Sequence, residues 1–233
     1  MAHEYQYTDA ARGGLDAVDQ RASFITRTYN HLFGAIVAFA LIEVALFKLE
    51  IAPVIAQAML GTSWLLVLGG FMVVSWLASR VAHTAESMAA QYAALAGYVV
   101  AQALIFVPLL YIANHVAPGV IASAALVTMV GFAGLSAVAF VTRKDFSFLR
   151  GLLMWGGVGA LVLIGAGILF GFQLGVFFSV AMVVFAGAAI LYDTSNVIHH
   201  FPENRYVGAA LQLFASVALL FWYVLRIFIA SRD

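Results

Sequence analysis

The stretch from Ser87 to Thr142 reads SMAAQYAALAGYVVAQALIFVPLLYIANHVAPGVIASAALVTMVGFAGLSAVAFVT and contains no Asp, Glu, Lys or Arg over its 56 residues. One membrane-spanning helix needs about 20 predominantly apolar residues, so this stretch is too long for one crossing and long enough for two. It is interrupted at Asn114-His115-Val116-Ala117-Pro118-Gly119, where Pro and Gly stand beside polar residues, as they commonly do at helix ends. We therefore predict two membrane-spanning helices, over 89–112 and 120–141.

A second charge-free run extends from Gly151 to Tyr192, 42 residues, and is interrupted near Gly171-Phe172-Gln173. It predicts two further spans, over 152–170 and 174–198. Single apolar runs predict the other three spans, over 32–47, 63–79 and 207–229. The total is seven, and the short segment 51–60 is expected to lie in the membrane interface.

The composition supports the same fold class. Hydrophobic residues make up 64% of the chain and charged residues 9%, whereas a soluble domain usually has about a quarter of its residues charged. We expect an all-α membrane protein, a bundle of seven transmembrane helices in contact with the lipid bilayer. Residues 1–29 are polar and are expected to form a cytoplasmic N-terminal tail, and 30–233 the seven-helix domain. The net charge of zero gives no sign of nucleic-acid binding.

The basic residues predict the orientation, because cytoplasmic loops carry the excess of Lys and Arg. With the N-terminus inside, the cytoplasmic segments contain eight of them: Arg12, Arg21, Arg27, Arg80, Arg143, Lys144, Arg150 and Arg205. The outer segments contain three: Lys48, Arg226 and Arg232. We therefore expect the N-terminus in the cytoplasm and the C-terminus outside.

Three ionisable residues lie within or at the end of a predicted span, where charged groups are costly and often functional. Asp193 is either a capping or hydrogen-bonding residue near a helix end or an ion or proton site. Arg80 is either a topological anchor or a cationic partner of Asp193, since both lie at a similar depth. Glu43 either extends outward to the interface or lines a polar cavity.

The sequence contains no motif of a soluble enzyme. Asp193 has no second intramembrane aspartate with which to form a proteolytic pair. No set of metal ligands is readable, and no inverted repeat or pair of discontinuous helices indicates a solute transporter. We expect a protein that is not an enzyme and needs no cofactor.

Four segments resemble the Bax inhibitor family, also called the transmembrane Bax-inhibitor-motif family. They are Lys144–Leu149 (KDFSFL), Ile190–Thr194 (ILYDT), Ala209–Phe214 (AALQLF) and Leu220–Ile227 (LFWYVLRI). The resemblance extends over about residues 24–229 in the same seven-span arrangement. It implies a bundle with a central C-terminal helix.

The resemblance also implies a candidate site. In bacterial members that act as calcium leak pathways, two aspartates on the sixth and seventh helices share a proton, and an arginine ending the second helix can replace one of them as partner. Asp193 matches the first aspartate and Arg80 the arginine. Ser216 stands where the second aspartate is expected, and a serine hydroxyl forms hydrogen bonds but does not ionise at physiological pH. We therefore expect this chain to have the fold of the family but not its switch of two carboxylates.

Two functions follow from this resemblance. The first is an ion leak pathway for calcium, closed by an altered aspartate gate of Asp193, Arg80 and Ser216, with calcium as a permeant ion that Asp193 could contact. The second is a non-transporting modulator or substrate of a membrane-bound AAA protease of the FtsH type. Ser216, together with Arg27-Thr28-Tyr29, is similar to the bacterial branch that associates with this protease. Both functions place the protein in the bacterial cytoplasmic (inner) membrane.

Overall fold

The computed structural model describes residues 2–116 and 118–232, with side chains from Val18 onward, and every regular element within these ranges is helical. Seven of the helices are long and apolar enough to cross a membrane, which confirms the predicted fold class. The elements are α1 (Ala2–Lys48), α2 (Ile51–Leu60), α3 (Trp64–Thr84), α4 (Met88–Val116), α5 (Val120–Thr142), α6 (Leu149–Phe170), α7 (Gly175–His199), η1 (Glu203–Arg205) and α8 (Tyr206–Ala230).

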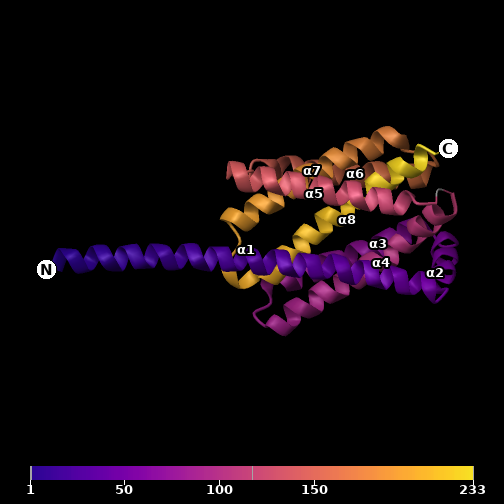
Figure 1. Cartoon of the computed structure of the whole chain (residues 1–233). Coiled ribbons are helices and arrows are strands. Elements are labelled where there is room, and N and C mark those ends of the chain that lie inside the picture. Colours follow the sequence, from indigo (N-terminus) through magenta and orange to yellow (C-terminus); the bar gives the residue numbers. More distant parts are fainter. Residues whose placement is uncertain (1, 117, 233) are drawn as a thin grey trace.

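The helix ends fall where the sequence signals place them. The charge-free run 87–142 divides into α4 and α5, and Gly119 precedes α5 with a φ of 83°, a conformation that glycine adopts without steric cost. The second run divides at Gly171, which follows α6 with a φ of 73°. The segment 51–60 forms the short helix α2, at the end of the bundle opposite the N-terminus (Figure 1).

The first helix differs from the expectation. α1 has 47 residues and is about 70 Å long at 1.5 Å per residue, over twice the thickness of the hydrocarbon core of a bilayer. The expected boundary between residues 29 and 30 lies inside this helix, and Phe24 and Thr28 are already buried in the bundle. Polar composition alone does not end a helix, and residues 2–29 contain no proline. The N-terminal part of α1 therefore projects beyond the bundle (Figure 1).

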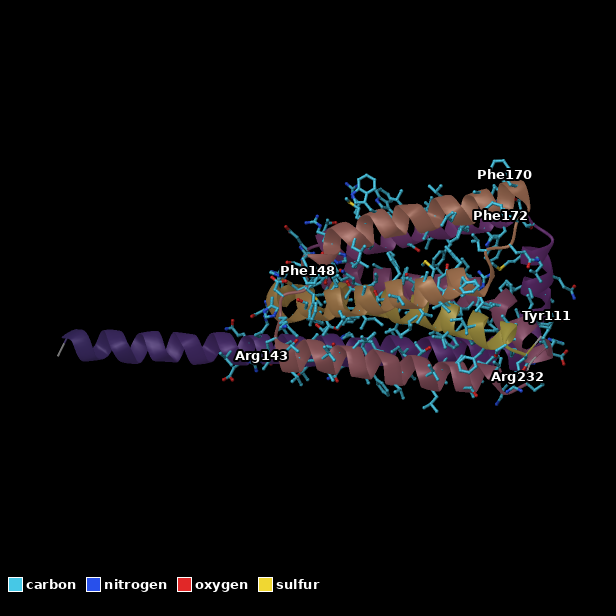
Figure 2. The ribbon with its side chains drawn as sticks, turned by 90° about the horizontal axis from the view of Figure 1, so that it is seen from above. Tyr111, Arg143, Phe148, Phe170, Phe172 and Arg232 are labelled. Atoms are coloured by element: carbon cyan, nitrogen blue, oxygen red, sulfur yellow. The ribbon has the colours of Figure 1, made fainter. Side chains whose placement is uncertain are left out.

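The C-terminal helix α8 is central, as predicted. It packs against α1, α3, α4, α5 and α7, and the small residues Gly208, Ala209 and Ala210 at its start are fully buried or nearly so. Large apolar side chains cover the outside of the bundle, and Phe177 is 93% exposed, as expected of a surface in contact with lipid. Figure 2 shows Arg143 and Phe148 at one end of the bundle, and Phe170, Phe172 and Arg232 at the other.

Candidate functional site

Asp193 lies inside the bundle, where α7 places it against α8. Its side chain is 4% exposed, and each carboxylate oxygen accepts one hydrogen bond from α8. Ser216 Oγ donates to Oδ2 at 2.5 Å and Gln212 Nε2 donates to Oδ1 at 2.5 Å. Gln212 and Ser216 are four residues apart, so one face of α8 presents both donors. A buried carboxylate is tolerated where such bonds satisfy it.

Gln212 connects this pair to α3. Its Oε1 lies 3.3 Å from Nε2 of His83, whose Nδ1 lies 2.7 Å from the carbonyl oxygen of Ser79. Both of these oxygens only accept, so each contact needs an N–H on the ring nitrogen that faces it, and a neutral imidazole has one N–H. The polar chain therefore runs from His83 through Gln212 to Asp193 and joins α3, α8 and α7.

Gly208 explains how α3 comes so close to α8. A Cβ atom added to Gly208 would lie 2.7 Å from the carbonyl oxygen of Ala82, a distance that real Cβ atoms do not show. Gly208 is one turn before Gln212, and Ala82 directly precedes His83. Only glycine at 208 permits the approach that brings His83 to Gln212.

The two residues after Asp193 contact other parts of the bundle. Thr194 Oγ1 lies 3.5 Å from both the hydroxyl of Tyr29 on α1 and Oγ of Ser136 on α5. Ser195 Oγ accepts a bond from the backbone N–H of Phe146 at 2.9 Å, in the loop between α5 and α6. Successive residues of a helix point about 100° apart, so three consecutive polar residues link α7 to α8, to α1 and α5, and to the loop between α5 and α6.

The structure does not bring Arg80 to Asp193. Arg80 is exposed, and its guanidinium lies 5.3 Å from the ring centre of Trp76, a lipid-facing residue. Asp193 has its hydrogen bonds from Gln212 and Ser216 instead. His83, almost one turn further along α3, is the polar residue of that helix that contacts Gln212 of α8.

Glu43 is separate from this cluster. Its side chain is 7% exposed, and among the described residues neither carboxylate oxygen has a hydrogen-bond partner. It is buried in the bundle, and it is not among the residues that line the large cavity described next. Burial of a carboxyl group without a hydrogen-bond partner costs free energy.

A cavity of about 1040 Å³ lies among α3, α4, α6, α7 and α8. At one end it is lined by Phe172, Arg226 and Ala230, close to the C-terminal ends of α6 and α8. At the other end it reaches Ala189 and Ser216. Since Ser216 both lines the cavity and binds Asp193, the carboxylate cluster closes the cavity on the side of the α7–α8 turn.

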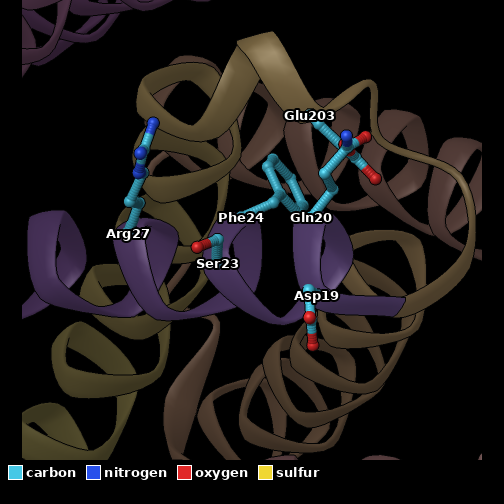
Figure 3. A pocket seen from close by; sticks show the side chains of 6 residues that line it. All are labelled: Asp19, Gln20, Ser23, Phe24, Arg27 and Glu203. Carbon is cyan, nitrogen blue, oxygen red and sulfur yellow. The ribbon is translucent and has the colours of Figure 1, made fainter. Parts of the chain in front are cut away.

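A smaller hollow of about 380 Å³ lies on the opposite side of that turn, between α1 and η1 (Figure 3). Phe24 and Arg27 line it together with Gln20 and Glu203, which lie close together in Figure 3, while Asp19 points away. The acidic groups do not converge there, and the described residues contain no group of three potential metal ligands.

The chemistry of the Asp193 cluster is that of one carboxylate with neutral donors. It can hold a proton, and each of its two oxygens accepts one hydrogen bond from α8. Ser216 cannot share a proton with it as a second carboxylate would.

Seven spanning helices around a buried polar cluster define a multi-pass membrane protein of the helical-bundle class. Residues 21–233 match the family described as Inhibitor of apoptosis-promoting Bax1, and the chain belongs to that Bax inhibitor family.

Individual relatives resemble part of the chain. It is 41% identical over 121 residues to an uncharacterized protein of Pseudomonas aeruginosa. It is 39% identical over 116 residues to YccA of Escherichia coli K12, named a modulator of FtsH protease, and 32% identical over 121 residues to LIFEGUARD 4 of Arabidopsis thaliana. The matched segments cover 49%, 49% and 48% of this chain and 52%, 52% and 48% of those relatives. The chain thus spans about half the length of the relatives it matches.

Sequence reasoning missed His83 and Gln212. Gln212 carries a readable signal, because it is the amide in the apolar segment 209–214 and precedes Ser216 by one turn. No signal in the sequence identifies His83, because the rotation of α3 about its axis decides whether residue 80 or residue 83 faces α8.

Proposed function

We propose that this chain is a non-enzymatic membrane protein that binds and modulates an FtsH-type ATP-dependent protease in the bacterial inner membrane. The observation that carries the proposal is its similarity to YccA, the modulator of FtsH protease, at 39% identity over 116 residues. A second relative, from Escherichia coli O6:H1, is named an inner membrane protein. Ser216 in place of a second aspartate agrees with this role, which needs no proton-sharing pair.

The projecting part of α1 supports a contact with such a partner. The hydrocarbon core takes up about 20 of its residues, and the bundle ends short of its N-terminal part (Figures 1 and 2). A segment that stands clear of the bundle is accessible to another protein. We propose that this helix is the part of the chain that the protease engages.

The basic residues support a cytoplasmic location for the projecting helix. The end of the bundle from which it projects also contains Arg143, Lys144, Arg150 and Arg205, and the positive-inside rule places such an end in the cytoplasm. An ATP-dependent protease uses ATP, which is on that side.

Co-purification tests the proposal. The full chain and a variant lacking residues 2–22 are expressed at equal levels in the same host membranes, and the amount of FtsH-type protease retained on each is measured. We expect retention on the full chain and loss on the truncated chain. A variant lacking 231–233 is the control and should retain the protease. Equal, background-level retention on all three would overturn the proposal.

We propose a cation leak pathway as a second candidate, because the large cavity ends at the Asp193 cluster. Two polar atoms that line it, Ser75 Oγ and Gln102 Oε1, are buried without a hydrogen-bond partner among the described residues, and water in the cavity would satisfy them. A bound calcium ion usually has six to eight oxygen ligands, and a single carboxylate supplies at most two of them. We therefore propose that calcium would pass through the cavity without being bound tightly at Asp193.

Flux into proteoliposomes tests this candidate. Calcium entry is compared for the unmodified chain, Asp193→Ala and protein-free vesicles. The candidate predicts entry above the protein-free rate and a changed rate in Asp193→Ala. Equal rates in all three samples would exclude it.

A further inference from the structure

The large cavity has two parts that differ in chemistry. Its inner part, toward Asp193, contains the polar side chains of Ser75, Gln102 and Ser216. Its outer part is lined mainly by apolar and aromatic side chains, among them Trp64, Leu68, Ile164, Ile168, Phe172 and Trp222. These lie at the outer ends of α3, α6 and α8, with Phe172 in the loop between α6 and α7, so the apolar part lies at the depth of one leaflet of the bilayer.

Arg226 places a positive charge at the edge of this apolar part. It lines the cavity, lies on the last turns of α8 and is half-buried. Among the residues that the structure describes, no carboxylate forms an ion pair with Arg226. The one ion pair among these residues joins His200 and Asp145. A half-buried guanidinium at the edge of an apolar space can bind the anionic group of a ligand whose apolar chain fills that space.

We propose that the outer part of the cavity binds one acyl chain of an anionic phospholipid from the adjacent leaflet, with its headgroup phosphate on Arg226. The chain would lie against Trp64 and Trp222, whose rings are 6.4 Å apart at their centres. Lipid binding at this site does not depend on protease binding. Such a chain would occupy the outer half of the route considered above for cations.

The four tryptophans allow a direct test. Trp64 and Trp222 line the cavity, whereas Trp76 and Trp155 are 60% and 71% exposed on the lipid face. The double variant Trp76→Phe/Trp155→Phe therefore reports on the cavity, and Trp64→Phe/Trp222→Phe reports on bulk lipid. Both are reconstituted in phosphatidylcholine nanodiscs with the same minor fraction of bromine-labelled phosphatidylglycerol or bromine-labelled phosphatidylcholine, and fluorescence quenching is measured.

We expect labelled phosphatidylglycerol to quench the cavity pair more than labelled phosphatidylcholine does, at an enrichment of about fivefold for one arginine near an anionic headgroup. The lipid-face pair has Arg80 beside Trp76, so its quenching by the two lipids should be the same in the unmodified chain and in Arg226→Gln. Arg226→Gln should remove the preference, Arg226→Lys should keep it, and Arg232→Gln at the same end should leave it unchanged. Equal quenching of the cavity pair by both lipids would overturn the proposal. So would a preference that survives in Arg226→Gln.

Discussion

The hydroxyl of Ser216 lies 2.5 Å from Oδ2 of Asp193, across the contact between α8 and α7, and donates a hydrogen bond to it. With Gln212 on the other oxygen, the aspartate is held by two neutral donors. The position of α8 that faces Asp193 thus carries a side chain without charge. This relationship makes the cluster a structural link between two helices that does not itself require a change of protonation.

Replacing Ser216 by Asp should convert this link into a pH-sensitive pair. Two carboxylates at hydrogen-bond distance share one proton and repel each other when both ionise. The thermal stability of Ser216→Asp should therefore fall as the pH rises through neutrality, and any flux should change over the same range. The neutral variant Ser216→Asn is the control and should show no such trend. Matching pH profiles for the two variants would mean that residues 193 and 216 do not face each other in the membrane.

Gly208→Ala should loosen the contact between α3 and α8. The added Cβ atom would lie 2.7 Å from the carbonyl oxygen of Ala82, so the helices must separate, at a cost of about 1–3 kcal/mol. Gly134→Ala is the matched control, since a Cβ at Gly134 meets nothing within 4 Å. Thermal unfolding in detergent measures the effect, and equal melting temperatures for the two variants would contradict the close approach.

Glu43→Leu should stabilise the protein. Both oxygens of Glu43 are buried without a partner among the described residues, and an unsatisfied buried polar group costs about 1–3 kcal/mol. Thermal unfolding again gives the readout, with Glu43→Gln as a comparison that keeps the polar atoms and should gain less. A lowered melting temperature for Glu43→Leu would show that Glu43 has a partner or function.

Asp145→Asn should remove an acid-sensitive contact in the loop between α5 and α6. The backbone N–H of Ser147, and then His200 at 2.9 Å, hold the pKa of Asp145 below its usual range. A lowered folded-state pKa means that this contact is present above the ordinary aspartate value and is lost as the pH falls through the lowered one. Proteolysis within residues 143–149 should rise on acidification in the unmodified chain and be high at all pH values in Asp145→Asn. An acid response that is the same in both chains would contradict this account.

The sequence predicts most of the fold, because charge-free runs and the Asn114–Gly119 interruption follow directly from the cost of polar groups in lipid. It does not predict the length of α1, since polar residues can continue a helix outside the bilayer. For the site, the family motif places Ser216 opposite Asp193. The rotation of α3, which turns His83 toward α8 and Arg80 away from it, depends on the packing of Gly208 on Ala82 and cannot be read from either segment alone.

The proposed protease contact is tested most directly by chemical cross-linking in native membranes. A photo-reactive amino acid is placed at Val18, which is 66% exposed on α1 near the bundle, and in a second sample at Val141, which is 83% exposed at the end of α5. The account predicts a cross-link to the FtsH-type protease from position 18 and a much weaker one from position 141. Absence of the protease from the cross-linked products at position 18 would contradict it.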